Sequence, residues 1–205
     1  MKNKKEKLGF NLILLGMIAA GKDTQANILM EKYALQPVES GKYFRKLSSA
    51  KTPDGEWLRR TTGKGHPTPV VLVKKFIVEQ LAKKQKSKDF LFIGNPRLKP
   101  EAQLLNKLLK ERKENYFALY VDLPSKEVYK RSFSRKTGNM PAYSRMLDSE
   151  KLIVNRIKYS KNQVFGKTVP YFKSLKKIKI INGNQSIEKV NEDIEKAIAQ
   201  FKKQK

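Results

Sequence analysis

Apolar residues along the chain fall into two patterns that alternate from one end of the sequence to the other. The first pattern is a short continuous apolar run bounded by polar or turn residues, which is typical of a buried strand in a parallel sheet. Such runs predict strands at residues 12–15, 90–93, 116–121 and 178–181, and residues 35–39 are a fifth strand candidate.

In the second pattern, apolar residues recur every three or four positions, which is the spacing of one helix face. We expect Ser125 to cap the start of one of these helices. The alternation of strands and helices predicts an α/β fold, in which helices cover both faces of a mostly parallel sheet. The chain has 205 residues, which suits a single domain with a sizeable core. The predicted helices span residues 24–33, 70–83, 100–113, 125–135, 148–164, 170–175 and the stretch from Ser186 past Ile198, with further helical turns after Ser40 and around Trp57.

The first predicted strand leads directly into Gly16-Met17-Ile18-Ala19-Ala20-Gly21-Lys22, which has the G-x-x-x-x-G-K spacing of a phosphate-binding loop. The N-terminus of the following helix offers unpaired N–H groups and a partial positive charge to an anion, and the lysine adds a full charge. Asp23 occupies the position where Ser or Thr is usual, and Thr24 follows it. The alternative is a plain strand, turn and amphipathic helix with an incidental lysine.

Several classes of protein are excluded by composition. Cysteine is absent and His66 is the single histidine, which rules out disulfides, thiolate nucleophiles and multi-histidine metal sites. We expect no membrane segment, because no stretch approaches about 20 uninterrupted apolar residues. The start of the chain superficially resembles a secretory signal, but Asn11 and Gly16 interrupt its apolar run and Gly21-Lys22 follows at once. We therefore expect a cytoplasmic protein.

The formal net charge of +26 requires nucleic acid to be considered as a partner. However, lysines are spread along the whole chain, and the clusters at residues 2–7 and 202–205 have the composition of solvated tails. No basic motif interleaved with aromatic residues stands out. We therefore expect nucleic acid to be a secondary partner at most, and a basic nucleic-acid-binding protein remains the alternative from another functional class.

Several spaced motifs, taken together, resemble the adenylate kinase family of nucleoside monophosphate kinases over nearly the whole chain, from about Leu12 to Ile198. Residues 16–26 resemble the phosphate loop of that family, and residues 40–45 resemble its turn and arginine on the monophosphate side. Gly94-Asn95-Pro96-Arg97 resembles the Gly-Phe-Pro-Arg element. Further matches are residues 62–67 after the monophosphate flap, the arginines of the lid region at 131, 135, 145 and 156, and residues 181–184 beside the donor base.

The resemblance implies a P-loop three-layer sandwich with a five-stranded parallel sheet, a small monophosphate-binding flap and a short lid. The single domain of residues 1–205 would comprise a core of residues 8–39, 86–135 and 146–201, a flap at about 40–69 and a lid at about 136–145. The lid is too short for a zinc-bearing version and has no cysteine, so we expect no zinc.

The family reaction passes the terminal phosphoryl group of a nucleoside triphosphate, usually ATP with Mg²⁺, to a nucleoside monophosphate. By resemblance, the expected catalytic residues are Lys22, Arg97, Arg135, Arg145 and Arg156. The expected ATP-binding residues are Gly16, Met17, Ile18, Ala19, Ala20, Gly21, Lys22, Asp23, Thr24, Arg131, Arg135 and Gly183. The expected monophosphate-binding residues are Ser40, Gly41, Arg45, Lys64, Gly94, Arg97, Glu101, Arg145 and Arg156. Each arginine could instead be a solvated surface charge.

Four positions depart from the family pattern. Ile93 stands where the strand normally ends in Asp, Lys42 replaces an acidic residue, and Leu147 stands where the first Asp of a lid pair is usual. The first two changes remove carboxylates from the metal side of the site. Asp23, the fourth departure, is our candidate for a relocated Mg²⁺-side carboxylate, and its alternative role is to stabilise the start of the helix.

The acceptor is expected to be AMP. Ser40 sits where AMP-selective members tend to carry Thr, and Glu101 sits where Gln commonly reads the acceptor base. A carboxylate accepts hydrogen bonds and cannot donate them, so it suits an amino-bearing base; Glu101 could equally be an ordinary residue of the first helical turn. The alternatives are a CMP or other nucleoside monophosphate kinase and a degenerate relative with weak transfer. We expect a monomer.

Overall fold

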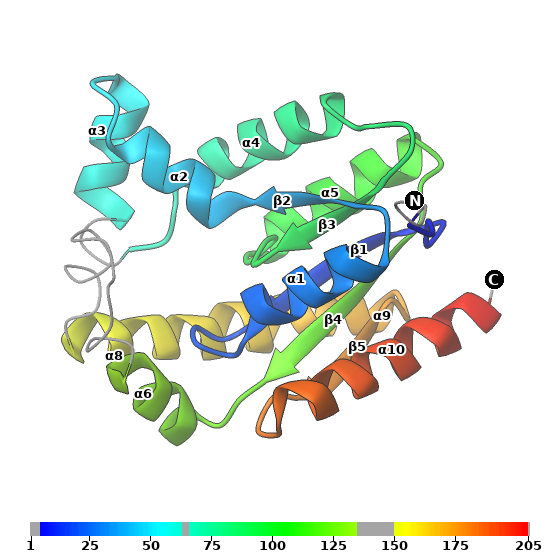
Figure 1. Cartoon of the computed structure of the whole chain (residues 1–205). Coiled ribbons are helices and arrows are strands. Elements are labelled where there is room, and N and C mark those ends of the chain that lie inside the picture. Colours follow the sequence, from blue (N-terminus) through cyan, green and yellow to red (C-terminus); the bar gives the residue numbers. More distant parts are fainter. Residues whose placement is uncertain (1–4, 63–65, 135–149, 205) are drawn as a thin grey trace.

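A parallel sheet of five strands forms the centre of the protein (Figure 1). The computed structural model describes residues 5–62, 66–134 and 150–204. The strand order is β2-β3-β1-β4-β5, and every neighbouring pair is parallel. The strands are β1 (Asn11–Gly16), β2 (Leu35–Glu39), β3 (Asp89–Ile93), β4 (Tyr116–Asp122) and β5 (Ile178–Asn182). All five predicted strands and the predicted fold class are thereby confirmed.

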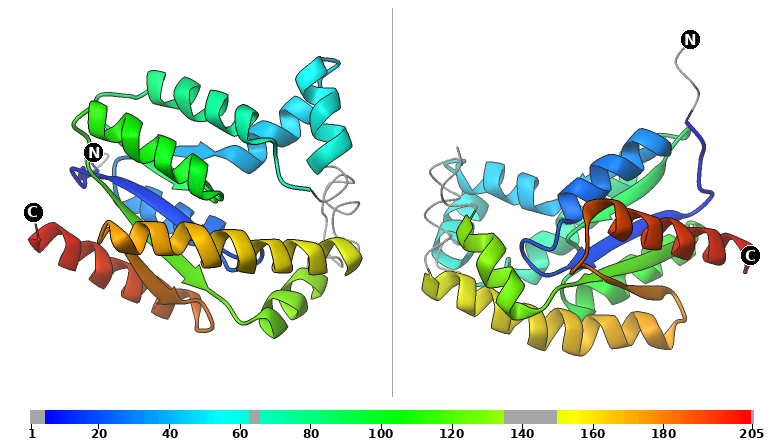
Figure 2. Two further views of the ribbon diagram at one scale, coloured as in Figure 1. Left: turned by 180° about the vertical axis from the view of Figure 1, so that it is seen from behind. Right: turned by 60° about the horizontal axis from the view of Figure 1, so that its bottom comes forward.

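Apolar side chains on both faces of the sheet explain why the central strands are continuous apolar runs. Leu12 and Leu14 of β1 belong to a core shared with helices α1 (Lys22–Lys32) and α10 (Ile187–Lys203). Ile13 and Leu15 belong to a second core on the other face, shared with α4 (Val70–Ala82), α5 (Lys99–Glu111) and α9 (Val169–Ser174). Because side chains alternate along a strand, a continuous apolar run serves both cores. The two views in Figure 2 show these helix layers on opposite sides of the sheet.

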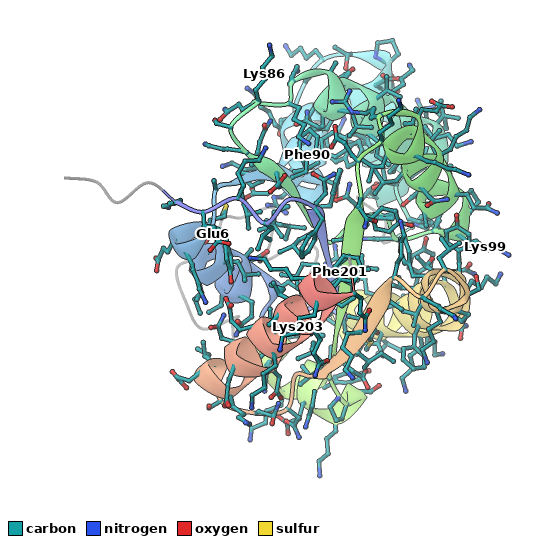
Figure 3. The ribbon with its side chains drawn as sticks, turned by 90° about the vertical axis from the view of Figure 1, so that its right-hand side faces the viewer. Glu6, Lys86, Phe90, Lys99, Phe201 and Lys203 are labelled. Carbon is teal, nitrogen blue, oxygen red and sulfur yellow. The ribbon has the colours of Figure 1, made fainter. Side chains whose placement is uncertain are left out.

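The positive charge is carried on the outside of this sandwich. Figure 3 shows Phe201 of α10 and Phe90 of β3 within the molecule, while Lys86 and Lys99 project from different parts of its periphery. Phe201 is 8% exposed and Phe90 is fully buried, whereas both lysines are exposed. Among the described residues, no helix combines the length and the apolar character that crossing a bilayer requires.

Two short helices leave the sheet after β2. They are α2 (Ser40–Ser48) and α3 (Pro53–Thr61), and they pack against each other within the segment that we assigned to the flap (Figure 1). Thr52 caps α3, since its side chain accepts a hydrogen bond from Gly55 N at 3.1 Å. The segment assigned to the lid, residues 136–145, lies outside the described residues.

The helical region before β5 differs from the expectation of two separate helices. Helix α8 (Glu150–Tyr159) continues into a π-helical stretch, η3 (Ser160–Thr168), and then into α9. Pro170 in the first turn of α9 has no N–H to donate back into η3, yet the helical conformation continues through it. The chain therefore forms one long helical run along the sheet.

The expected cap at Ser125 is wrong. Ser125 is the first residue of α6 (Ser125–Ser134), and the carbonyl of Pro124 accepts the first helical hydrogen bond, from Val128 N at 3.0 Å. Ser125 thus lies one position inside the helix, where its buried hydroxyl has no hydrogen-bond partner within the described part of the chain. In contrast, Ser186 does cap α10, since its hydroxyl accepts from Lys189 N at 3.2 Å.

Candidate active site

A cleft of about 620 Å³ lies at the carboxyl edge of the sheet. Leu14 of β1 and Glu39 of β2 both lie in register with Ile93 of β3, so the chain leaves these three strands at one edge. In open α/β sheets this edge is where ligands bind. The cleft walls come from the loop after β1, the start of α2, the turn after β3, α5 and α8. Segments far apart in sequence therefore meet around one space.

The loop after β1 has the backbone geometry of a phosphate cradle. Gly16, Ala19 and Gly21 all have positive φ, at 149°, 56° and 82°. A Cβ on Gly16 would lie 2.5 Å from the carbonyl oxygen of Val121, so no larger residue fits there. Gly21 precedes α1, and no side chain caps this helix start. The N–H groups of the first turn are therefore available to an anion.

Lys22 and Arg97 reach the same point from different elements. Lys22 opens α1, two residues before the predicted helix start, and Arg97 precedes α5. A Cβ on Gly94 would lie 3.8 Å from Lys22 Cε and 3.7 Å from Arg97 Nη2. Gly94 itself has φ of 71°, and its N–H donates to Leu14 O at 2.9 Å. Two cationic side chains thus flank the turn that follows β3.

Glu101 fixes the turn that follows β3 through hydrogen bonds to its backbone. Its side chain is 3% exposed, and Oε2 accepts hydrogen bonds from Arg97 N at 2.8 Å and Leu98 N at 3.2 Å. Burial raises the pKa of Glu101, and the two backbone donors oppose that shift. The residue also lines the cleft. Glu101 thus lies in the first turn of α5, as one of its two predicted roles requires. Its place in the cleft wall is compatible with the other role, which is to contact the acceptor base.

The opposite wall is the start of α2. Ser40, Gly41, Lys42 and Arg45 line the cleft there. A Cβ on Gly41 would lie 3.2 Å from Arg45 Nη1, so this guanidinium folds back over the start of its own helix. Arg45 is exposed and Ser40 is 5% exposed.

Arg156 completes the cleft from α8. Tyr159, one helical turn later, lines the cleft beside it. The pKa of Tyr159 is raised to about 12, mainly by burial and also by the charge of Glu101, while Arg97 opposes the shift. Tyr159, Glu101 and Arg97 are therefore close enough to interact electrostatically. Arg135, Arg145 and Lys64, which we also expected here, lie outside the described residues.

A second group of predicted residues lies beyond the cleft lining. Arg131 Nη2 donates to Gly183 O at 3.4 Å, which brings together the two residues expected beside the donor base. Gly183 is tightly packed, since a Cβ there would lie 2.6 Å from Asp122 O. The predicted residues that line the cleft are Gly16, Ile18, Ala19, Lys22, Asp23, Ser40, Gly41, Arg45, Gly94, Arg97, Glu101 and Arg156. Those that do not are Met17, Ala20, Gly21, Thr24, Arg131 and Gly183.

Sequence reasoning missed several polar residues of the cleft. Asn95 and His66 lie within motifs that we recognised, yet only the three-dimensional arrangement gives them a place in the wall. Tyr159 could have been found from its spacing of three residues after Arg156, which puts both on one helix face. The other missed polar residues are Asn27, Glu39, Thr62, Thr68, Ser132 and Ser160.

The cleft has few groups that could hold a metal. Within the described ranges, no three Asp, Glu or His side chains come together as a metal-binding set. Asp23, Glu39 and Glu101 are the carboxylates among the cleft-lining residues. Asp23 is exposed and lies in the first turn of α1 beside the phosphate loop. Since Mg²⁺ keeps several waters and is often held by one carboxylate and the substrate phosphates, Asp23 fits such a role.

Comparison with known proteins gives one consistent result. A sequence profile described as adenylate kinase matches residues 14–177. The adenylate kinase of Fusobacterium nucleatum is 27% identical over 210 residues, covering 93% of this chain and 99% of the relative. That of Clostridium novyi is 30% identical, with 89% and 95% covered, and that of Azobacteroides pseudotrichonymphae is 32% identical, with 90% and 94% covered. This chain therefore belongs to the adenylate kinase family of nucleoside monophosphate kinases.

Proposed function

We propose that this protein transfers the terminal phosphoryl group of ATP to AMP in the cleft at the carboxyl edge of its sheet. The observation that carries this proposal is the approach of Lys22 and Arg97 to one point beside Gly94. Phosphoryl transfer depends mainly on positioning and on positive charge around the transferring group. A lysine from the donor loop and an arginine from the acceptor side, meeting at one turn, supply both.

On the donor side, we assign the triphosphate to the loop of residues 16–22 and to the first turn of α1. The positive φ angles of Gly16 and Gly21 turn this loop, and the uncapped helix start leaves N–H groups for phosphate oxygens. Lys22 Nζ donates to Met17 O at 2.5 Å, so the ammonium group lies over the loop. Arg131 and Gly183 would contact the donor base.

On the acceptor side, we assign the monophosphate to Arg45, Arg97 and Arg156. A guanidinium presents a planar fork of donors that matches two phosphate oxygens at once. These arginines come from α2, the turn after β3 and α8, and all three line the cleft. Ser40, Gly41 and Gly94 would bring the backbone close to the acceptor. Lys64, Arg135 and Arg145 stay predictions for the parts of the chain outside the described residues.

The reaction itself needs little covalent chemistry from the protein. The acceptor phosphate oxygen attacks the terminal phosphorus of ATP in line, and the bond from that phosphorus to the bridging oxygen of ADP breaks. Lys22, Arg97 and Arg156 would hold the negative charge of the transferring group. Closure of the lid segment over the two nucleotides would exclude water, so that the phosphoryl group reaches AMP instead of being hydrolysed.

Mg²⁺ is the cofactor that the family implies. When bound with ATP, the ion supplies charge neutralisation at the phosphate oxygens. Ile93 leaves no carboxylate at the end of β3, and Asp23 is the exposed carboxylate closest in sequence to the phosphate loop. We therefore assign to Asp23 the task of orienting the hydrated ion.

A coupled assay tests this proposal. ATP is offered with AMP, CMP, GMP or UMP, with and without Mg²⁺, and formation of ADP and of the nucleoside diphosphate is followed. We expect transfer to AMP to be fastest and to require Mg²⁺. Binding of both nucleotides without transfer would instead support the alternative of a degenerate relative. That alternative is motivated by Lys42 and Ile93, which stand where the family usually has carboxylates. Salt-dependent retention on RNA or DNA, unaffected by nucleotide, would favour the nucleic-acid-binding alternative.

A further inference from the structure

Asn95 carries a buried side-chain amide that has no hydrogen-bond partner. The residue is 2% exposed, and neither Oδ1 nor Nδ2 is paired within the described residues. It nevertheless lines the cleft. A buried amide with both its donor and its acceptor unsatisfied is unfavourable for folding, and such groups call for an explanation. In a ligand-binding cleft, the simplest explanation is a ligand that supplies both partners.

The turn that carries Asn95 is fixed from several sides. Gly94 N donates to Leu14 O at 2.9 Å, and Arg97 Nε donates to Gly94 O at 2.8 Å. Glu101 accepts from Arg97 N, and Thr168 Oγ1 donates to Arg97 O at 2.7 Å. Asn95 lies between these anchored residues, so its backbone cannot easily move to bring the amide to another partner. The amide is therefore fixed close to its present position, in a residue that lines the cleft.

We propose that Asn95 is a specificity-determining residue that reads the base of the acceptor nucleotide through an exocyclic amino group and the ring nitrogen beside it. In this arrangement Oδ1 accepts from the amino group and Nδ2 donates to the ring nitrogen. An asparagine amide makes this pair of hydrogen bonds with adenine, which offers an amino donor next to a ring acceptor. The inference rests on the proposed kinase function and extends it to the choice of acceptor.

Glu101 determines the direction of this recognition. If the Asn95 amide were rotated so that Oδ1 and Nδ2 exchanged places, it could also pair with a carbonyl oxygen and a ring N–H, as in hypoxanthine. Glu101 lines the same cleft from the helix that follows the Asn95 turn, and its ionised carboxylate accepts hydrogen bonds only. A base carbonyl beside it would face a second acceptor, whereas an amino group would find a partner. Asn95 and Glu101 together therefore favour AMP over IMP.

Asn95→Leu is the test, because leucine keeps the branched outline of asparagine, with bulkier end groups, and has no polar atoms. We expect the dissociation constant for AMP, measured by calorimetry without ATP, to rise about 10-fold to 100-fold, since AMP loses two hydrogen bonds. KM for ATP should change less than twofold. The preference for AMP over IMP should fall. The melting temperature of the ligand-free variant should rise, because an unsatisfied buried amide has been removed.

Asn106→Leu is the matched control. The amide oxygen of Asn106 accepts from Tyr116 Oη at 2.8 Å, outside the cleft. This variant should have a lower melting temperature and unchanged AMP binding, which is the opposite of the result for Asn95→Leu. Should Asn95→Leu fail to fold, Asn95→Asp keeps the acceptor and removes the donor, and it should still weaken AMP binding.

Two results would overturn the inference. One is an Asn95 variant whose dissociation constant for AMP stays within twofold of the original, which would leave the amide serving a bound water. The other is an equal loss of affinity for ATP and AMP, which would indicate general damage to the cleft. Both leave the kinase function intact, whereas an unsubstituted protein that transfers no phosphoryl group to AMP would refute the proposed function itself.

Discussion

Thr168 and Arg97 are joined by a hydrogen bond across 71 residues of sequence. The Thr168 hydroxyl donates to the carbonyl oxygen of Arg97 at 2.7 Å, and Thr168 is fully buried at the end of the π-helical stretch. The long helical run from α8 to α9 therefore reaches the turn that carries a proposed phosphate-binding arginine. Since π-helical turns often occur at functional sites, we infer that η3 serves to place this hydroxyl.

Thr168→Val should lower both kcat and the stability of the fold. Valine keeps the shape of threonine and removes the donor, so the carbonyl of Arg97 loses a buried partner at an expected cost of about 1–2 kcal/mol in stability. We expect kcat to fall about 10-fold through misplacement of Arg97, with KM for ATP unchanged. Steady-state kinetics and urea unfolding check this. Thr61→Val is the control, because the hydrogen bonds that the Thr61 hydroxyl makes to the described residues stay within α3, to Trp57 O at 2.8 Å and Leu58 O at 3.5 Å.

Arg97→Lys should lower kcat about 10²-fold to 10³-fold, the range found when one donor to a transition state is removed. Lysine keeps the charge but loses the planar fork, and it cannot reproduce the 2.8 Å hydrogen bond from Nε to Gly94 O. The fold should be unaffected, as judged by the melting temperature. Arg112→Lys is the control, since Arg112 pairs with Glu114 at 2.9 Å and does not line the cleft. Normal turnover by Arg97→Lys would remove Arg97 from the proposed machinery.

Most of the fold could be predicted from the sequence because its signals are local. β1 and β3 are almost wholly apolar because helices cover both faces, and that pattern is visible in the sequence alone. The phosphate loop was found for the same reason, since Gly16, Gly21 and Lys22 act through spacing within one segment. The fold class and the family were confirmed on these signals.

The missed features depend on contacts between distant segments. The burial of Asn95 without a partner follows from how β3, α5 and η3 pack, and no periodicity encodes it. The join of α8 to α9 through η3 is another example, because Gly166 and Pro170 are residue types that usually end a helix and the chain here stays helical through both. Ser125 was misassigned because a shift of one residue in the helix start changes which residue is the cap. Here the carbonyl of Pro124, one residue earlier, accepts the first helical hydrogen bond.

Asp23→Asn should raise the Mg²⁺ concentration required for half-maximal turnover by about 10-fold, if Asp23 orients the hydrated ion as proposed. The variant keeps the size of the side chain and removes its charge. A Mg²⁺ titration of the coupled assay at fixed ATP measures the shift. Asp54→Asn in α3 serves as the control, since Asp54 does not line the cleft. An unchanged Mg²⁺ requirement would leave Asp23 with the alternative role of stabilising the start of α1.

Gly16→Ala should be strongly destabilising. The new Cβ would stand 2.5 Å from the carbonyl oxygen of Val121 in β4, so two neighbouring strands would have to separate. We expect a loss of about 2–4 kcal/mol in the free energy of unfolding, from the clash and the unfavourable φ together. Gly9→Ala isolates the effect of the unfavourable φ, because Gly9 has φ of 78° and an added Cβ there would meet no other atom within 4 Å. This variant should cost about 1 kcal/mol in stability. Equal losses from both variants would contradict the steric account.

Glu101→Gln should stabilise the protein at neutral pH. Burial raises the pKa of Glu101, so between about pH 4.5 and its higher folded-state pKa the folded state holds a proton on this group that the unfolded state has released. Stability from this group therefore falls as pH rises through the folded-state pKa. Glutamine stays neutral, and its carbonyl oxygen can still accept from Arg97 N and Leu98 N. We expect the melting temperature at pH 8 to rise by about 2–4 °C, or about 1 kcal/mol for a chain of this size, with the gain vanishing near pH 4.5.

Glu192→Gln on α10 is the matched control of opposite sign. Hydrogen bonds and charge from Lys189 and Lys196 lower the pKa of Glu192 to about 2, so its contribution is present at neutral pH and is lost on acidification. Removing that exposed carboxylate should leave the melting temperature at pH 8 unchanged or slightly lower. If both glutamine variants shifted the pH profile of unfolding in the same direction, burial could not be the cause of the Glu101 effect, because Glu192 is exposed.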